Sequence, residues 1–285
     1  MKMSEEHKLT TVTREDIRKA AEALGLKQGD TVLIHSSFKS LGFVEGGAEA
    51  VIGGFRDAIG ERGNLVFPTL CQRDFEHAYE NWHLDAPSDV GYLTNYFRKL
   101  PGAKRSDQAT HSVAAQGPDA EYLTCTHGQT GRRYGVYGDT PFAADSPWEK
   151  MYQMNAKVVF LGVGIRYCTF RHYAEYRFVE QCLEKAKSAP EYAHLKDRVQ
   201  CYGKPQENAV WPHTENEYVL PFLEKAGKVS RVRCGDAELL AVSARAFVDQ
   251  TLALLDARDA QLYRYAWDSP KRKLLEQWIA DIDAI

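Results

Sequence analysis

Residues 30–69 read DTVLIHSSFKSLGFVEGGAEAVIGGFRDAIGERGNLVFPT, and the fold class can be predicted from this segment. Residues 30–37 and 64–69 are short apolar runs with the length and β-branched content of buried strands, and residues 48–59 between them have the pattern of a helix. A helix between two buried strands is the β-α-β unit. We therefore expect an α/β fold with a mixed, mainly parallel central sheet flanked by helices.

Further elements are expected on both sides of this unit. Thr13 is suited to cap a helix over residues 13–24, because an acidic first turn follows it. The other expected helices cover residues 92–100, 147–152, 169–187, 217–226, 244–257 and 268–285, and the other expected strands cover residues 157–164, 228–233 and 235–243. Residues 188–216 are polar and loop-like. Pro221 is expected in the first turn of its helix, since a proline further inside removes a backbone hydrogen bond.

The composition of the 285-residue chain argues against several classes of protein. With 36 basic and 39 acidic residues the net charge is −3, so we expect no nucleic-acid partner. Six cysteines without C-x-x-C spacing favour reduced thiols, a cytoplasmic protein and no metal site. Residues 1–8 contain no apolar segment of the kind found in signal peptides, and no window of 18 uninterrupted apolar residues occurs, so we expect neither a signal peptide nor a membrane partner.

The strongest catalytic candidate lies in residues 169–177, TFRHYAEYR, directly after the apolar run 157–164. On a helix, His172 and Glu175 are three residues apart and share one face. The carboxylate could then orient the imidazole and stabilise its protonated form, which makes His172 a candidate general base. The alternative is an ordinary solvated pair on a helix surface.

Polar side chains also follow the strands of the opening stretch. His35, Ser36 and Ser37 end the first strand, and Thr69 ends the second. Ligands of parallel sheets gather where strands end and helices begin. The glycine-rich turn 42–47 could let the backbone approach a phosphate or a pantetheine chain, although such turns are usually just turns.

Three further features have two interpretations each. The acidic and aromatic segment 72–89 suits a cationic, ring-bearing ligand, and it equally suits a solvated loop. Arg105 could contact a nucleotide phosphate, but a Lys-Arg pair is more often surface. His111 is a second catalytic histidine or, in the favoured interpretation, a hydrogen-bonded structural one.

Eight short blocks in a fixed order carry a resemblance to a known family. They are VLIHSSFKSLG (32–42), VEGGAEAVI (44–52), LVFPT (65–69), PSDVG (87–91), THSVAAQGPDA (110–120), SPWEK (146–150), VVFLGVG (158–164) and TFRHYAE (169–175). In this order they resemble the aminoglycoside 3-N-acetyltransferase family, also called antibiotic N-acetyltransferases. The resemblance implies acetyl transfer from acetyl-CoA to an amine, on an α/β fold unrelated to the GNAT acetyltransferases.

The resemblance also implies roles for individual residues. His172 and Glu175 fall on the T-x-x-H-x-A-E motif as the catalytic base and its partner. The residues expected around acetyl-CoA are His35, Ser36, Ser37, Val44, Gly46, Arg105, Ser106, Thr110 and Ser112. Those expected near the acceptor are Thr69, Asp74, Asp89 and Tyr92. The implied cosubstrate is acetyl-CoA, without a metal, and the implied partner is a small-molecule amine; a homodimer through the terminal helix is left open.

The chain departs from the family pattern in three places. Many members read R-S-x-H-P-T-H-S where residues 105–112 read RSDQATHS, so Gln108 and Ala109 replace His-Pro. Within a single domain spanning residues 1–285, we expect residues 181–215 to be a variable insertion and residues 258–285 to be a C-terminal helical extension. These regions are the ones expected to shape the acceptor pocket.

The expected mechanism is direct attack of the amine on the thioester. An ammonium must first lose a proton, and a histidine whose pKa is raised by a carboxylate is suited to accept it. No cysteine has an obvious activating partner, so no acetyl-enzyme is expected; Cys168, four residues before His172, is the nearest challenge. The expected acceptor is an aminoglycoside or other amino sugar, with a metabolic amino-sugar nucleotide or a biosynthetic amine as the alternative. A noncatalytic CoA-binding protein is a third hypothesis.

Overall fold

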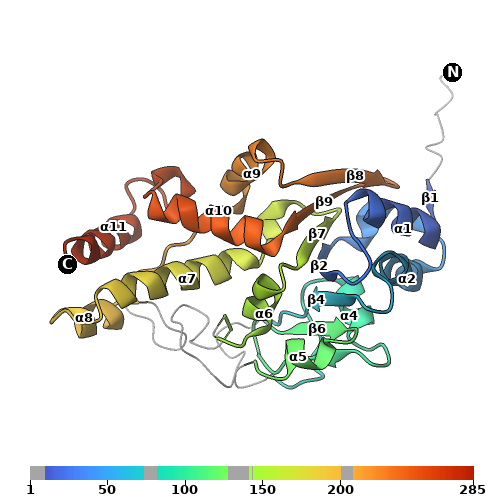
Figure 1. Cartoon of the computed structure of the whole chain (residues 1–285), viewed down its shortest axis with the longest axis horizontal. Helices are drawn as coiled ribbons and strands as arrows, with labels where there is room; N and C mark the ends of the chain where they lie inside the picture. Colours follow the sequence, from blue (N-terminus) through green and yellow to red (C-terminus); the bar gives the residue numbers. More distant parts are fainter. Residues whose placement is uncertain (1–9, 74–81, 128–140, 143, 200–207) are drawn as a thin grey trace.

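The computed structural model describes residues 10–73, 82–127, 141–142, 144–199 and 208–285 (Figure 1). Its main sheet has seven strands in the order β5-β6-β4-β2-β7-β9-β8. The bounds are β2 (Thr31–Ser36), β4 (Asn64–Pro68), β5 (Lys104–Arg105), β6 (Val113–Gln116), β7 (Lys157–Leu161), β8 (Ser230–Cys234) and β9 (Ala237–Ser243). A separate two-stranded sheet pairs β1 (Thr11–Val12) with β3 (Phe43–Val44).

The helices are interspersed with these strands along the described chain. Their bounds are α1 (Arg14–Ala23), α2 (Gly47–Ile59), α4 (Tyr92–Phe97), α5 (Ala120–Thr124), α6 (Pro147–Gln153), α7 (Phe170–Lys185), α8 (Tyr192–Asp197), α9 (Asn216–Lys225), α10 (Ala244–Asp256) and α11 (Pro270–Asp283). Short 3-10 helices are η1 (Phe38–Leu41), η2 (Ile165–Tyr167) and η3 (Ala260–Leu262).

The expected α/β architecture with a mixed sheet is confirmed, but parallel pairing is confined to its centre. Strands β4, β2 and β7 are parallel, and β2-α2-β4 is the expected β-α-β unit. The pairings β5-β6, β6-β4, β7-β9 and β9-β8 are antiparallel, so the description of the sheet as mainly parallel is wrong. The physical reason is clearest at β8 and β9, which a two-residue turn with Gly235 at φ +57° joins as a hairpin.

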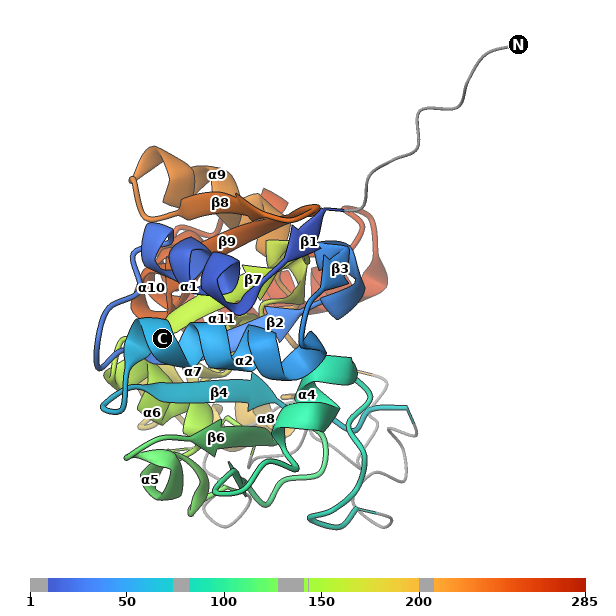
Figure 2. The ribbon, with the colours of Figure 1, turned by 90° about the vertical axis from the view of Figure 1, so that its right-hand side faces the viewer.

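The two faces of the sheet are covered by different helices. In Figure 2, α1 and α2 lie over one face, and α6 and α7 lie behind the other. Within β2, Val32 and Ile34 belong to the core on the first side, whereas Leu33 belongs to the core on the second. Both faces are buried, which explains why the strand is a continuous apolar run rather than an alternating one.

The predicted cap of α1 is confirmed, whereas the predicted position of the proline in α9 is wrong. Thr13 caps α1, and its side chain and that of Asp16 form a reciprocal capping box. Pro221, in contrast, is the sixth residue of α9, so its expected place in the first turn is wrong. Pro221 and Glu217, whose carbonyl loses its helical donor, are both exposed, so water can satisfy that carbonyl. The short helix α8 also lies in the stretch that we expected to be loop.

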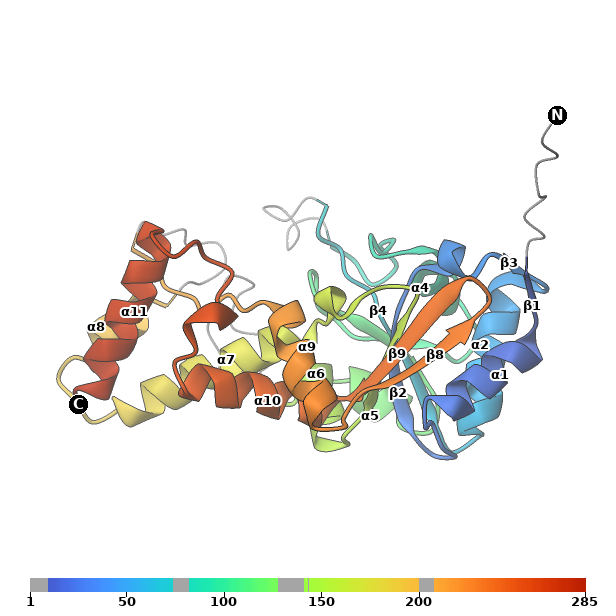
Figure 3. The same cartoon turned by 90° about the horizontal axis from the view of Figure 1, so that it is seen from above.

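Helices α7 and α10 extend away from the sheet, and α8 and α11 lie at their far end (Figures 1 and 3). The terminal helix was expected, and α11 begins at Pro270. The described part of the chain contains no helix that is both long and apolar enough to cross a membrane.

Candidate active site

A cleft opens where β2, β4 and β7 end at one edge of the sheet, and its volume is about 520 Å³. It is lined by strand ends, by η2 and by the start of α7: His35, Ser36, Pro68, Leu70, Gln72, Asp89, Val90, His111, Val163, Arg166, Tyr167, Cys168, Thr169, Arg171 and His172. This is the edge at which α/β sheets usually bind ligands. Three of the residues singled out in the sequence for cofactor binding or catalysis, His35, Ser36 and His172, therefore meet in one cavity.

His172 lies in the first turn of α7, and its side chain reaches Glu175 one turn further on. The distance from His172 Nδ1 to Glu175 Oε2 is 3.0 Å. The expected i,i+3 pair is therefore present. It is not a solvated surface pair, because His172 is only 6% exposed and Glu175 is completely buried.

Three donors besides His172 hold the Glu175 carboxylate. Trp211 Nε1 donates to Oε2 at 3.0 Å, and Thr214 donates to Oε1 through its backbone N at 2.7 Å and through Oγ1 at 2.9 Å. Burial by itself would raise the pKa of Glu175, but the neighbouring His172 and Arg171 lower it to about 2. A carboxylate that accepts these hydrogen bonds remains ionised at neutral pH.

The sequence did not reveal Trp211 and Thr214. They belong to the polar stretch after α8, where no hydrophobic periodicity and no motif marks them. Only the fold brings this segment back against α7. A tryptophan among polar residues was the one available signal, and by itself it indicates no partner.

The protonation state of His172 differs from the sequence-based expectation. Burial lowers the pKa of His172 from 6.5 to about 4, and this effect outweighs the opposite effect of the Glu175 carboxylate. The expectation of a raised pKa is therefore wrong. An imidazolium at this position would lose its hydration and would also face the Arg171 guanidinium. At neutral pH His172 is a neutral imidazole that can accept a proton without first losing one.

Arg171 fixes which nitrogen of His172 carries the hydrogen. Its Nε lies 3.4 Å from His172 Nε2, and its Nη1 donates to the Thr214 carbonyl at 3.3 Å. An arginine can only donate, so Nε2 acts as the acceptor and Nδ1 carries the hydrogen that Glu175 accepts. The lone pair of Nε2 therefore points toward a residue that itself lines the cleft.

His111 is a second buried histidine beside His172, with the two ring centroids 5.5 Å apart. Its Nδ1 lies 2.9 Å from Thr110 Oγ1, and its Nε2 lies 3.0 Å from Gln72 Nε2. Burial lowers the pKa of His111 well below 6.5. These hydrogen bonds suit the favoured structural interpretation, although the ring also lines the cleft.

Gln108, where many family members have histidine, holds the turn that carries His111. Its Oε1 accepts hydrogen bonds from the backbone N of Thr110 at 2.9 Å and of His111 at 2.5 Å. In this chain the Gln108 side-chain amide therefore stabilises the turn, at the position where many family members have the dipeptide His-Pro.

Arg105 and Ser106 lie in the protein framework outside the cleft lining. The Arg105 guanidinium donates to the carbonyls of Leu84, Ala86 and Thr69 at 2.8, 2.5 and 2.8 Å. The Ser106 hydroxyl is 2.8 Å from Nδ1 of the buried His127 and accepts from the Val113 N–H.

The remaining residues expected at acetyl-CoA are not brought to the cleft lining. The Ser37 N–H donates to the Leu161 carbonyl at 2.8 Å, and Val44 is a core residue. Gly46 is the N-cap of α2 at φ +78°. Thr110 and Ser112 are fully buried.

The residues expected near the acceptor have different surroundings. Asp89 lines the cleft, and its Oδ2 accepts from the backbone N of Gln72 and of Arg73, both at 2.7 Å. Thr69 is buried with its Oγ1 2.9 Å from Ser112 Oγ. Tyr92 is 58% exposed and packs on Phe38 with ring centroids 5.2 Å apart. Asp74 lies outside the described residues.

Cys168 lines the cleft, but its thiol is not activated. The side chain is buried, and burial raises its pKa to about 12. At neutral pH it therefore remains a thiol rather than the thiolate that attacks thioesters.

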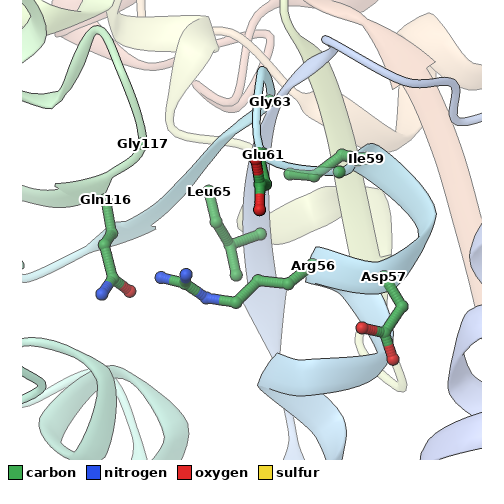
Figure 4. A pocket seen from close by; sticks show the side chains of 9 residues that line it. Arg56, Asp57, Ile59, Glu61, Gly63, Leu65, Gln116 and Gly117 are labelled. Atoms are coloured by element: carbon green, nitrogen blue, oxygen red, sulfur yellow. The ribbon is translucent and has the colours of Figure 1, made fainter.

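A second cavity of about 340 Å³ lies at the other end of β4, and Figure 4 shows Arg56 and Gln116 pointing into it. None of the residues expected to bind or react lines it. Within the described ranges, no group of three or more His, Cys, Asp or Glu side chains is placed to hold a metal ion.

The fold and the buried pair define the class: an α/β protein with a buried histidine–carboxylate pair in a cleft at the ends of its parallel strands. The chain belongs to the aminoglycoside 3-N-acetyltransferase family, whose model matches residues 33–256. Residues 257–285 lie beyond that match.

Proteins with similar sequences are named as aminoglycoside N-acetyltransferases or as proteins like them. Aminoglycoside N(3)-acetyltransferase VII of Streptomyces paromomycinus is 35% identical over 182 residues, which are 58% of this chain and 60% of the relative. The prophage-derived aminoglycoside N(3')-acetyltransferase-like protein YokD of Bacillus subtilis is 30% identical over 59% of this chain and 66% of the relative. The chain thus spans less than two thirds of the length of these relatives.

Solved structures share the fold over more of the chain. The structure of AAC-IIIb with CoASH superposes with a TM-score of 0.66 at 20% identity, covering 90% of this chain and all of the other. The apoenzyme of AAC(3)-IVa gives a TM-score of 0.69 at 21% identity, covering 95% of this chain and 99% of the other.

Proposed function

We propose that the protein is an acetyl-CoA-dependent N-acetyltransferase that acetylates an amine of an amino sugar, with His172 as the general base. The observation that carries this proposal is the buried His172–Glu175 pair in the cleft of a chain that belongs to the aminoglycoside 3-N-acetyltransferase family. The names of the relatives support an amino-sugar acceptor, and the CoASH in the AAC-IIIb structure supports the cosubstrate.

The proposed reaction has three balanced steps. The acceptor gives up its ammonium proton to solvent. As the neutral amine nitrogen attacks the thioester carbonyl carbon, one N–H proton passes to Nε2 of His172, where it replaces the hydrogen bond from Arg171 Nε. The tetrahedral intermediate then collapses, the carbon–sulfur bond breaks, and the amide forms. The proton held by His172 passes to the departing CoA sulfur, which restores the neutral imidazole.

Glu175 serves this cycle in two ways. It accepts the Nδ1 hydrogen, which keeps the proton-accepting lone pair on Nε2, and its charge stabilises the imidazolium that forms during transfer. The pKa of His172 rests at about 4 because the ring is buried, so its base form is fully populated at neutral pH.

The surroundings of His35 favour a ligand-binding position at the end of β2. Its ring stacks on Phe160 at 5.3 Å, it is 6% exposed, and its Nε2 has no hydrogen-bond partner among the described residues. A buried polar atom without a partner costs free energy unless a ligand or water satisfies it. We assign His35 and Ser36 to the acetyl-CoA side of the cleft, and Asp89 to the acceptor side.

Two assays test the proposal together. Purified protein is incubated with acetyl-CoA and a panel of aminoglycosides, amino-sugar nucleotides and simple amino sugars, and both free CoA thiol and acetylated product are measured. We expect release of CoA that depends on the amine and matches product in a 1:1 ratio. Calorimetry with acetyl-CoA is the second assay, and no binding at millimolar ligand would contradict the proposal.

A further inference from the structure

The described lining of the cleft carries two arginines and one carboxylate. Among the described lining residues, the side chains charged at neutral pH are those of Asp89, Arg166 and Arg171. Asp89 already accepts two backbone N–H groups, and its second oxygen lies 3.7 Å from Arg73 Nε. The charge of Asp89, the one acidic side chain of the described lining, is therefore already balanced by these N–H groups and by Arg73.

Neither arginine of the cleft has a carboxylate partner among the described residues. In that part of the chain Arg166 forms no ion pair, and its guanidinium lies over the Tyr167 ring at 5.0 Å from the centroid. Arg171 also forms no ion pair there; it contacts His172 Nε2 and the Thr214 carbonyl. Its charge also acts on the ionised Glu175 carboxylate, which is buried on the Nδ1 side of His172 and does not line the cleft. The three cleft histidines do not add charge, because burial lowers the pKa of each.

The position of Arg171 indicates whether its guanidinium contacts the acceptor or the phosphates of acetyl-CoA. Its Nε is 3.4 Å from His172 Nε2, the atom that would take the proton from the amine. A molecule that presents its amine to His172 therefore comes within reach of Arg171. The phosphates of acetyl-CoA are separated from its thioester by the pantetheine arm, so a thioester at His172 keeps them away from Arg171.

We propose that Arg166 and Arg171 form an anion subsite for a phosphate or carboxylate group on the acceptor, so that the substrate is an amino sugar carrying an acidic group. The proposal rests on the N-acetyltransferase function proposed above. Arginine binds phosphate and carboxylate through charge-assisted hydrogen bonds. Polycationic aminoglycosides are poorer acceptors, because their ammonium groups meet like charge in the cleft.

The test compares matched acceptors. Wild-type protein is assayed for kcat/KM with glucosamine, with a glucosamine phosphate, with an amino-sugar nucleotide and with a polycationic aminoglycoside. We expect the two acidic acceptors to exceed glucosamine by roughly 10- to 100-fold, the value of one charge-assisted hydrogen bond. Equal values for glucosamine and its phosphate, or a preference for the aminoglycoside, would overturn the subsite.

Arg166→Glu provides the variant, since Arg166 is exposed and its guanidinium contacts the Tyr167 ring rather than a carboxylate of the described chain. It should raise KM for the acidic acceptors by about 10-fold or more relative to KM for glucosamine on the same variant, and it should improve the cationic acceptor. Arg62→Glu makes the same charge change at an exposed residue before β4, away from the cleft, and should change none of these values.

A further arm separates the two sources of phosphate. Acetyl-CoA is compared with acetyl-pantetheine, a thioester that lacks the nucleotide phosphates. If Arg166→Glu raises KM for acetyl-CoA alone and leaves acceptor preference unchanged, the arginines bind the cosubstrate and the proposal is wrong. Failure of the proposed function is distinct, because wild-type protein would then release no CoA with any amine.

Discussion

The proposed chemistry depends on where the His172 imidazole carries its one proton. His172 is flanked by an acceptor, Glu175, at Nδ1 and by a donor, Arg171, at Nε2, which selects one neutral tautomer. The pair could be predicted from the spacing His-x-x-Glu. The direction of the pKa shift could not, because it depends on burial by segments that are distant in sequence.

Glu175→Gln is expected to disturb this tautomer. In either orientation the new side-chain NH2 would face N–H donors: those of Trp211 Nε1 and His172 Nδ1 on one side, or the backbone N–H of Thr214 on the other. The charge that raises the pKa of His172 would also be lost. We expect acetyl transfer to fall by about 10²–10⁴-fold and the pKa of His172 to fall further. NMR of the ring nitrogens and the transfer rate measure both. An unchanged rate with an unchanged tautomer would refute the orienting role.

Cys168→Ser is expected to retain activity. The thiol is buried and its pKa is raised to about 12, so it supplies no thiolate at neutral pH. We expect kcat to stay within about threefold of wild type, because serine keeps the size of the side chain. Loss of transfer in a correctly folded variant, or a trapped acetyl-enzyme seen by mass spectrometry, would show that the mechanism is not direct.

At the scale of elements, the sequence was informative where local rules apply. The strand ends, the Thr13 cap and the β-α-β unit follow from periodicity and capping, and they place His35 and Ser36 at the cleft. The direction in which β6 and β9 pair with the central strands depends on how the chain returns after long connections, which has no local signal. Trp211 and Thr214, which donate hydrogen bonds to Glu175, could not be predicted for the same reason. The two-residue turn between β8 and β9 is a local signal, and it makes that pair antiparallel.

The crossing of α1 and α2 provides a test at this scale. A Cβ added to Gly54 would lie 2.6 Å from the Ile17 Cβ and 2.7 Å from the Arg14 carbonyl, whereas one added to Gly53 meets only the flexible end of the Arg14 side chain at 2.9 Å. Gly54→Ala should lower the free energy of unfolding by about 1–3 kcal/mol.

Gly53→Ala is the matched control in the same helix. Its gain in helix propensity, about 1 kcal/mol, should offset the displacement of the Arg14 side chain. Urea unfolding compares the two variants. Equal stability of both would mean that α1 and α2 are not packed as described.

At the scale of the whole molecule, four buried histidines couple stability to pH. Burial holds the pKa of His35 and His172 at about 4 and that of His127 at about 3, and it lowers the pKa of His111 well below 6.5. In the unfolded chain they titrate near the ordinary value of 6.5.

The free energy of unfolding should therefore fall as the pH drops from about 6.5 toward 4. In this window the unfolded chain binds protons that the folded chain does not, and each such histidine contributes about 1.4 kcal/mol per pH unit. Above pH 7 this contribution is complete and constant. Urea unfolding at pH 7, 6 and 5 measures it, and a free energy that stays level over this range would contradict the burial of neutral histidines.

The proposed role of His172 as the base of an N-acetyltransferase can be tested on the enzyme itself. The most direct measurement is the rate of acetyl transfer from acetyl-CoA by wild type and by His172→Ala, with acetyl-CoA binding and the unfolding curve measured in both proteins. We expect the variant to bind acetyl-CoA and to fold, but to transfer acetyl about 10²–10⁴-fold more slowly. A folded His172→Ala variant that transfers acetyl at the wild-type rate would contradict the account.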